Sequence, residues 1–209
     1  MAVVAWTSVH ASDATIHQPA GSRGLKSTLR RPALAEVPST PNGKTTKPLK
    51  PALKTGDEVA SFYSRAVTGP LMNKSICYVC RNGERPVVMV LLRRIDPELK
   101  PLMQRIDRLV DKNRANGLRG FGVLIGDDSV QATSTVQTFA FNNKLSLPIT
   151  VAGEAAAAGI GSLPKDAAVT VVLYRKRKVV QTWCYRAGEL KAAAVKDVVK
   201  RVERFAGGS

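Results

Sequence analysis

The sequence predicts an α/β domain in which helices flank a central mixed β-sheet, with a disordered basic tail ahead of it. The chain has 209 residues, which suits one ordinary domain plus a tail, because domains usually run to about 100–200 residues. Hydrophobic residues make up 44% and charged residues 23%, so the chain can bury a core. From Gly56 onward, short β-branched runs alternate with helical periods, as expected for helices packed on a sheet.

Residues 1–55 are predicted to be a Pro- and Lys-rich tail or linker, and residues 56–209 the folded domain. The first segment holds six of the twelve prolines and no sustained apolar period. Its opening run from Ala2 to Trp6 is similar to the remnant of an export signal but has no basic n-region. We therefore expect an extracytoplasmic or periplasmic protein if the start is a truncated signal, and a cytoplasmic one otherwise.

The strong positive charge predicts weak, non-specific attraction to polyanions. The chain has 32 Lys and Arg against 16 Asp and Glu, a formal net charge of +16. Both histidines, His10 and His17, lie in the tail, which excludes His-based triads and His-containing zinc sites from the domain. No run approaches the ~18 apolar residues of a transmembrane segment. No Gly-rich phosphate or dinucleotide loop is visible, and we expect no cofactor and no metal.

The apolar run at 86–92 predicts a central strand that is covered on both faces. Asp96 is the predicted N-cap of the helix that follows, with Pro97 at its first position.

The basic run Arg175, Lys176, Arg177 and Lys178 is predicted to be the tip of a β-hairpin, and these four residues are candidate anion-binding groups. The other expected strands are 120–125, 145–151, 168–174 and 179–185, and the other expected helices are 130–143, 154–159 and one from about Gly188 to the end.

This order of elements resembles the thioredoxin-like superfamily, and within it the peroxiredoxin (alkyl hydroperoxide reductase) and thiol-disulfide reductase branch. Residues 62–85 entering Pro86-Val87-Val88 are similar to that family's N-terminal hairpin and central strand, and residues 169–180 to its strand, charged turn and strand. Leu147-Pro148-Ile149-Thr150 and the 154–161 segment are similar to the stretch before that hairpin. The resemblance implies a thioredoxin-like fold, a thiol substrate or unknown protein partner, and a possible cis-proline at Pro148, with Pro164 as the competing position.

The chain departs from this family at the reactive cysteine. In thioredoxins and peroxiredoxins that cysteine follows the central strand, where the N-terminus of the next helix stabilises a thiolate. Arg93, Arg94, Asp96 and Pro97 occupy this place here, and none carries a thiol. Peroxidase activity is therefore disfavoured, and we expect any enzymatic activity to be thiol-disulfide exchange.

Cys77 and Cys80 form a CxxC pair ahead of the central strand, and they are the candidate catalytic dithiol. In an extended chain their Cα atoms would lie ~10 Å apart, beyond the ~7 Å that a disulfide allows. If the chain turns at Tyr78-Val79, the pair can close a small ring and exchange thiols. A structural disulfide, half of a metal site and plain packing cysteines remain alternatives. The cations that would favour a thiolate in the turned form are Lys74, Arg81 and Arg85.

Two classes of function follow. The first is a thioredoxin-like domain without the usual thiol, acting as a binding or scaffold module or as a non-standard dithiol redox protein through Cys77 and Cys80. The alternative is an electrostatic binder of nucleic acid or another anionic surface, through the basic tail and hairpin. Cys184, on a predicted strand, is expected to pack, and Asp127-Asp128 is a minor candidate for a cation.

Overall fold

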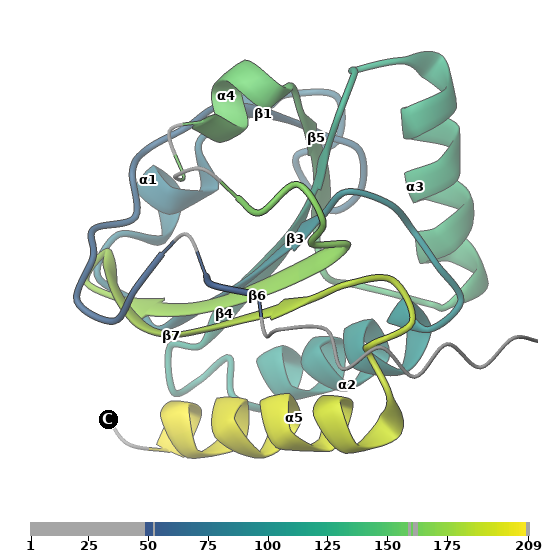
Figure 1. Ribbon diagram of the computed structural model, residues 1–209. Coiled ribbons are helices and arrows are strands. Elements are labelled where there is room, and N and C mark those ends of the chain that lie inside the picture. The colour runs from purple at the N-terminus through teal and green to yellow at the C-terminus, as the bar shows by residue number, and fades with distance from the viewer. Residues whose placement is uncertain (1–48, 52, 159, 161–162, 208–209) are drawn as a thin grey trace, which may run out of the picture. The chain divides into compact units, whose positions relative to one another are not determined.

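One mixed sheet of seven strands organises the part of the chain that the structure, a computed structural model, describes: residues 49–51, 53–158, 160 and 163–207. The strand order is β2-β1-β5-β4-β3-β6-β7 (Figure 1). The predicted signal remnant and most of the predicted tail lie outside the described residues. No helix within the described segments is long and apolar enough to cross a membrane.

The predicted strands and helices are present, with small changes of boundary. The strands are β1 (Ser64–Ala66), β2 (Ser75–Ile76), β3 (Val87–Leu92), β4 (Arg119–Ile125), β5 (Ile149–Ala152), β6 (Val169–Arg175) and β7 (Lys178–Tyr185). The helices are α1 (Tyr78–Asn82), α2 (Leu99–Lys112), α3 (Val130–Asn142), α4 (Glu154–Ala158) and α5 (Ala192–Gly207). β3 pairs in parallel with β4 and antiparallel with β6, and all six of its residues are buried. The mixed sheet with a buried interior strand at 86–92 is therefore confirmed.

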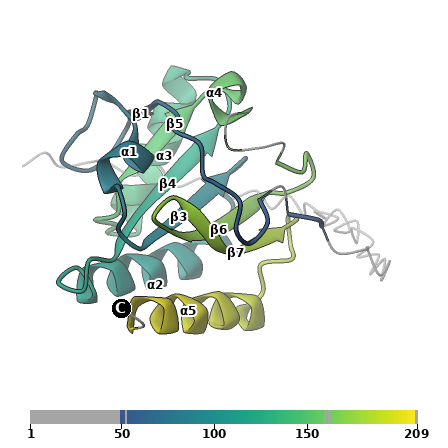
Figure 2. The same ribbon diagram turned by 90° about the vertical axis from the view of Figure 1, so that its left-hand side faces the viewer.

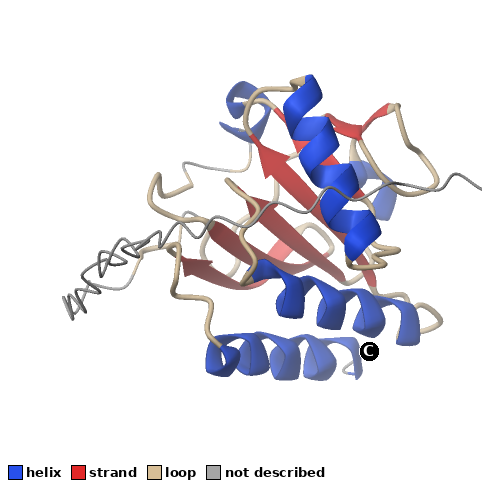
Figure 3. Ribbon diagram, turned by 90° about the vertical axis from the view of Figure 1, so that its right-hand side faces the viewer, coloured by secondary structure: helices blue, strands red, loops and turns tan. Residues whose placement is uncertain are grey.

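Alternate residues of β3 divide the core into two layers, because successive side chains of a strand point to opposite faces. Val88, Val90 and Leu92 pack with the apolar sides of α2 and α5, and with part of α3. We call this side the α2 face; Figure 3 shows the three long helices over it. Val87, Met89 and Leu91 pack on the other side with residues of α1. We call that side the α1 face.

The α1 face is covered by short segments instead of long helices. The antiparallel hairpin of β1 and β2 pairs through β1 with β5, and α1 then leads into β3 (Figure 2). Leu53, Val59 and Phe62 add to the same layer, each at most 6% exposed. Packing thus begins a few residues before the expected boundary at Gly56, while the division into tail and domain remains a prediction.

Two expected helix starts were wrong, and in both cases an acid near the expected start is used in a local hydrogen bond. α2 begins at Leu99, with Glu98 as its N-cap, since the Asp96 carboxylate instead accepts a hydrogen bond of 2.6 Å from Arg94 Nε. The last helix begins at Ala192, because Glu189 Oε2 accepts the backbone N–H of Arg186 at 2.8 Å.

The segment before β5 also differs from expectation. The strand expected at 145–151 begins only at Ile149, because the backbone N–H groups of Ser146 and Leu147 donate to the Asp107 carboxylate at 3.2 and 2.7 Å. The prediction of a cis peptide bond before Pro148 was wrong as well. No peptide bond of the described residues is cis.

Candidate active site around Cys77 and Cys80

Cys77 and Cys80 are joined by a disulfide, and their Cα atoms lie 5.3 Å apart. Cys77 is the N-cap of α1, with an extended backbone, and Cys80 lies in the single helical turn that follows. Of the two geometries that the sequence allows, the turn at Tyr78-Val79 is therefore correct. A helical turn brings residues i and i+3 onto neighbouring positions, which is what a disulfide over this spacing needs.

The two sulfurs have different surroundings. Cys77 is 5% exposed and belongs to the core of the α1 face, whereas Cys80 is exposed. Cys77 Sγ accepts a hydrogen bond of 3.1 Å from the backbone N–H of Cys80. The same N–H would stabilise negative charge on Cys77 Sγ once the bond is broken, because hydrogen bonding to a charged form favours it. The two cysteines thus differ in exposure, and Cys77 Sγ is the one that accepts a backbone hydrogen bond.

Core packing fixes α1 in place. The ring of Tyr78 stacks on Phe121 of β4, with centroids 5.1 Å apart and planes 20° apart. Val79 is fully buried. Gly83 ends the turn at a positive φ of 57°, a conformation that glycine adopts without a steric penalty, and its N–H donates to Val79 O at 3.2 Å. The disulfide thus lies on a rigidly anchored turn.

The usual place for the reactive cysteine is occupied by ion pairs. Arg93 pairs with Glu154 of α4, and its backbone N–H donates to Ala168 O at 3.0 Å. Arg94 pairs with Asp96. This turn leads into α2, which packs on the α2 face, whereas the disulfide belongs to the α1 face. The two neighbouring sulfurs do not lie at the start of α2.

Comparison with known proteins supports the architecture. No family model matches the sequence, and no curated protein matches it. Among solved structures, a putative protein disulfide isomerase from Bacteroides thetaiotaomicron matches with a TM-score of 0.59 and 13% identity, over 77% of this chain and 95% of that one. The peroxidoxin BcpB from Mycobacterium tuberculosis matches at 0.52 and 19%, over 73% and 97%. A DsbF homologue from Corynebacterium diphtheriae matches at 0.53 and 16%, over 78% and 96%.

The fold is thioredoxin-like. These neighbours confirm the predicted fold class, and they are named as thiol-disulfide and peroxidoxin proteins. At identities this low, the likeness extends to the fold alone. What the thioredoxin-like chain does must be argued from its own residues.

The four cations of the basic hairpin tip do not form a single anion-binding site. Arg175 donates to the backbone carbonyl of Phe205 at 3.2 Å, and its guanidinium lies 5.2 Å from the centre of the Phe205 ring. Arg177 pairs with Glu58 at 3.3 Å. Lys176 stands at the tip with a positive φ of 52°, and Lys178 begins β7. Two of the four candidate groups are thus used in contacts within the domain.

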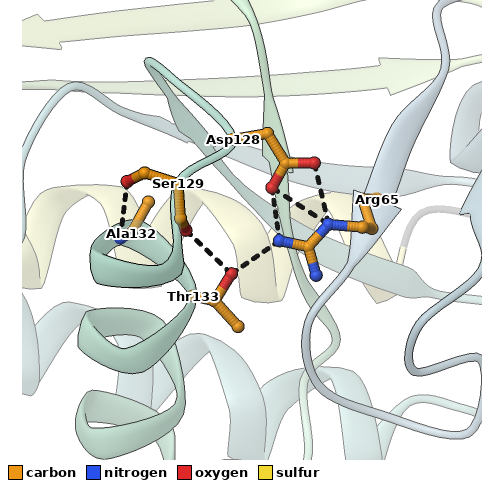
Figure 4. A network of polar contacts seen from close by, with 5 residues as sticks. All are labelled: Arg65, Asp128, Ser129, Ala132 and Thr133. Atoms are coloured by element: carbon orange, nitrogen blue, oxygen red, sulfur yellow. Dashed lines mark hydrogen bonds and ion pairs between the residues drawn. The ribbon is translucent and has the colours of Figure 1, made fainter.

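The Asp127-Asp128 loop does not offer a cation site, since the Asp128 carboxylate is used (Figure 4). Both of its oxygens accept from Arg65 Nε, at 2.9 and 2.8 Å. The same guanidinium contacts Thr133, in the first turn of α3. The hydrogen bond from Arg65 holds the pKa of Asp128 below its usual value. Within the described segments no group of three or more His, Cys, Asp or Glu could hold a metal ion.

Cys184 is a separate, half-buried thiol on β7. It lies opposite Thr170 of β6, whose hydroxyl donates to Cys184 Sγ at 3.6 Å. Burial raises the pKa of the Cys184 thiol, so it stays protonated and unreactive at neutral pH.

Sequence reasoning missed one group of residues. Arg114 and Arg119 line a pocket together with Arg81 and Arg85, although they stand far from the CxxC pair in the chain. No local motif connects the four arginines. Only the packing of α1 and α2 around the start of the parallel strands brings them together.

Proposed function

We propose that this thioredoxin-like chain is a thiol-disulfide oxidoreductase that works through Cys77 and Cys80 and not through the position after β3. The observation that carries the proposal is the pairing of an exposed Cys80 with a buried Cys77 whose sulfur accepts an amide hydrogen bond. This arrangement gives one sulfur that a partner can reach and one that can leave as a stabilised thiolate.

The exchange can be written from these two sulfurs. A substrate thiolate attacks Cys80 Sγ, the Sγ–Sγ bond breaks, and the electron pair leaves on Cys77 Sγ, where the Cys80 N–H stabilises it. A second substrate thiolate then attacks the substrate sulfur of the mixed disulfide and releases Cys80 as a thiolate. The substrate dithiol loses two electrons and becomes a disulfide, and the two protons it gave up end on Cys77 and Cys80. The reverse sequence reduces a substrate disulfide.

A disulfide of this kind is better suited to repeated oxidation and reduction than to stabilising the folded chain. Its two cysteines are only three residues apart, so the bond restricts the unfolded chain little and contributes about 2 kcal/mol in the chain-entropy account. Tyr78 and Val79 hold the turn in the core independently of it. The oxidised and reduced forms are therefore both expected to stay folded, as redox cycling requires.

The competing function is a binding or scaffold module in which the bond never opens. The hairpin gives no support to the electrostatic binder, because two of its four cations, Arg175 and Arg177, are used in contacts within the domain. The experiment below separates the redox function from the scaffold function.

Reduction of insulin by dithiothreitol, followed by turbidity, tests the proposal. The wild-type chain should accelerate precipitation, Cys80→Ser should lose at least 90% of that acceleration, and Cys184→Ser, which removes the separate thiol, should keep it. Titration of free thiols with and without reductant should show a gain of two in the wild type. If the wild type gives no acceleration and no change in thiol count, the scaffold function stands instead.

A further inference from the structure

A pocket of about 350 Å³ opens where the parallel strands begin. Arg85 precedes β3, Arg119 begins β4 and Pro148 precedes β5, while Tyr78 of α1 and Asp111 of α2 close it from the two faces of the sheet. The volume lies at the lower end of the range for small-molecule pockets, about 300–1,000 Å³. The proposed exchange takes place at Cys77 and Cys80, and neither of them lines this pocket.

The pocket concentrates positive charge. Four arginines line it: Arg81, Arg85, Arg114 and Arg119. Burial lowers the pKa of Arg119, and the nearby charges of Arg85 and Arg114 lower it further. The Arg119 guanidinium is therefore close enough to those of Arg85 and Arg114 to be repelled by each, and a bound anion would relieve that repulsion.

The two acids of the pocket offset half of this charge, and four guanidinium groups with two carboxylates leave a formal net charge of +2. Asp107 is used by the backbone, because its Oδ1 accepts the N–H groups of Ser146 and Leu147 at 3.2 and 2.7 Å. Among the described residues Asp111 pairs with Arg114, at 3.6 Å, and both side chains are largely exposed. Such a pair is weak and readily exchanged for another anion.

A buried hydroxyl provides the second, independent observation. Tyr78 lines the pocket and is 6% exposed, yet its hydroxyl has no hydrogen-bond partner among the described residues. Burial raises the pKa of this phenol, against the charge of Arg81, so it carries its proton and can donate it in a hydrogen bond. Buried polar groups normally have a hydrogen-bond partner. A hydroxyl without one, in a pocket lined by four arginines, is expected to donate to an anionic ligand.

We propose that this pocket binds a small ligand through phosphate or carboxylate oxygens. Guanidinium groups bind such oxygens with two parallel hydrogen bonds, and the Tyr78 hydroxyl supplies a further donor. Arg119 is held in place because its Nη1 donates to the carbonyls of Arg114 and Leu118 at 3.0 and 2.8 Å.

Calorimetric titration of the full chain at low salt with two probes, pyrophosphate and citrate, tests the proposal. Saturable one-to-one binding of either probe supports it, and the tighter of the two identifies phosphate or carboxylate as the preferred chemistry. Arg85→Gln combined with Arg114→Gln should weaken binding at least 30-fold. Arg201→Gln on the exposed side of α5 changes charge without touching the pocket and should change affinity less than twofold. Binding of neither probe, or equal weakening by the control, overturns the proposal.

Tyr78→Phe separates this site from general charge effects. The variant should bind the tighter probe at least fivefold more weakly while its melting temperature rises, because a buried hydroxyl without a partner is removed. Unchanged affinity would show that the hydroxyl does not contact the ligand and would contradict the proposed geometry. Cys80→Ser should bind both probes normally, so failure of the redox proposal and failure of this one can be told apart.

Discussion

The segments on the two sides of β3 are stabilised in different ways. The turn after the strand, at 93–98, is held by ion pairs of partly exposed side chains, such as Arg93 with Glu154 and Lys191 with Glu98. The α1 turn before the strand is held by buried rings, by Val79 and by a covalent bond. In this thioredoxin-like fold, the sulfurs stand on the side that the core makes rigid. The fold alone therefore does not determine where the two sulfurs lie. The following changes test whether the turns before and after β3 differ in stability as described.

The largest effect should come from removing the support of α1. Phe121→Ala deletes a fully buried ring on which the Tyr78 ring stacks. We expect the free energy of unfolding to fall by about 3–5 kcal/mol. Urea unfolding measures this. Phe141→Ala is the matched control, since that ring is 85% exposed, and it should change stability by less than about 0.5 kcal/mol. Similar losses in both variants would show that α1 does not depend on the core.

Reduction of the disulfide should have an intermediate effect. We expect dithiothreitol to lower the free energy of unfolding by about 2 kcal/mol or less, because the closed loop is short. Urea unfolding with and without reductant measures it, with Cys80→Ser as a control that should not respond to the reductant. Unfolding of the reduced protein in buffer would identify the bond as a structural element and remove the case for cycling.

The smallest effect should come from the turn after β3. Glu154→Gln breaks the ion pair with Arg93, but the Glu154 side chain is 63% exposed, so we expect a loss of at most about 1 kcal/mol. The difference from the wild type should shrink further in 0.5 M salt. A loss above about 2 kcal/mol would mean that this turn is as firmly built as α1, and the contrast between the two segments would disappear.

The strands of this fold could be predicted because their signal is local. The continuous apolar runs of β3 and β4 have few alternatives to a strand buried on both faces. The start of α2 could not be placed from the sequence, because Arg94 competes with the helix for the Asp96 carboxylate. Such competition between neighbours leaves no trace in a capping pattern.

The candidate site was only half predictable. The CxxC spacing identified the cysteines, but Tyr78 and Val79 suit a strand as well as a helix, and their burial against Phe121 decides between the two. The arginine pocket could not be foreseen at all. Arg85, Arg114 and Arg119 meet because α2 crosses from the end of β3 to the start of β4, and that is a property of the topology.

The most direct test of the central claim is to trap the mixed disulfide with a substrate disulfide such as insulin. Cys77→Ser leaves the exposed Cys80 to attack and removes the sulfur that would release the product, so this variant should accumulate a covalent adduct at Cys80. Cys80→Ser leaves only the buried Cys77 and should accumulate at least tenfold less. Mass spectrometry of the two variants, with Cys184→Ser added to each, measures the difference. Equal trapping, or trapping in neither, would contradict a redox centre built from these two cysteines.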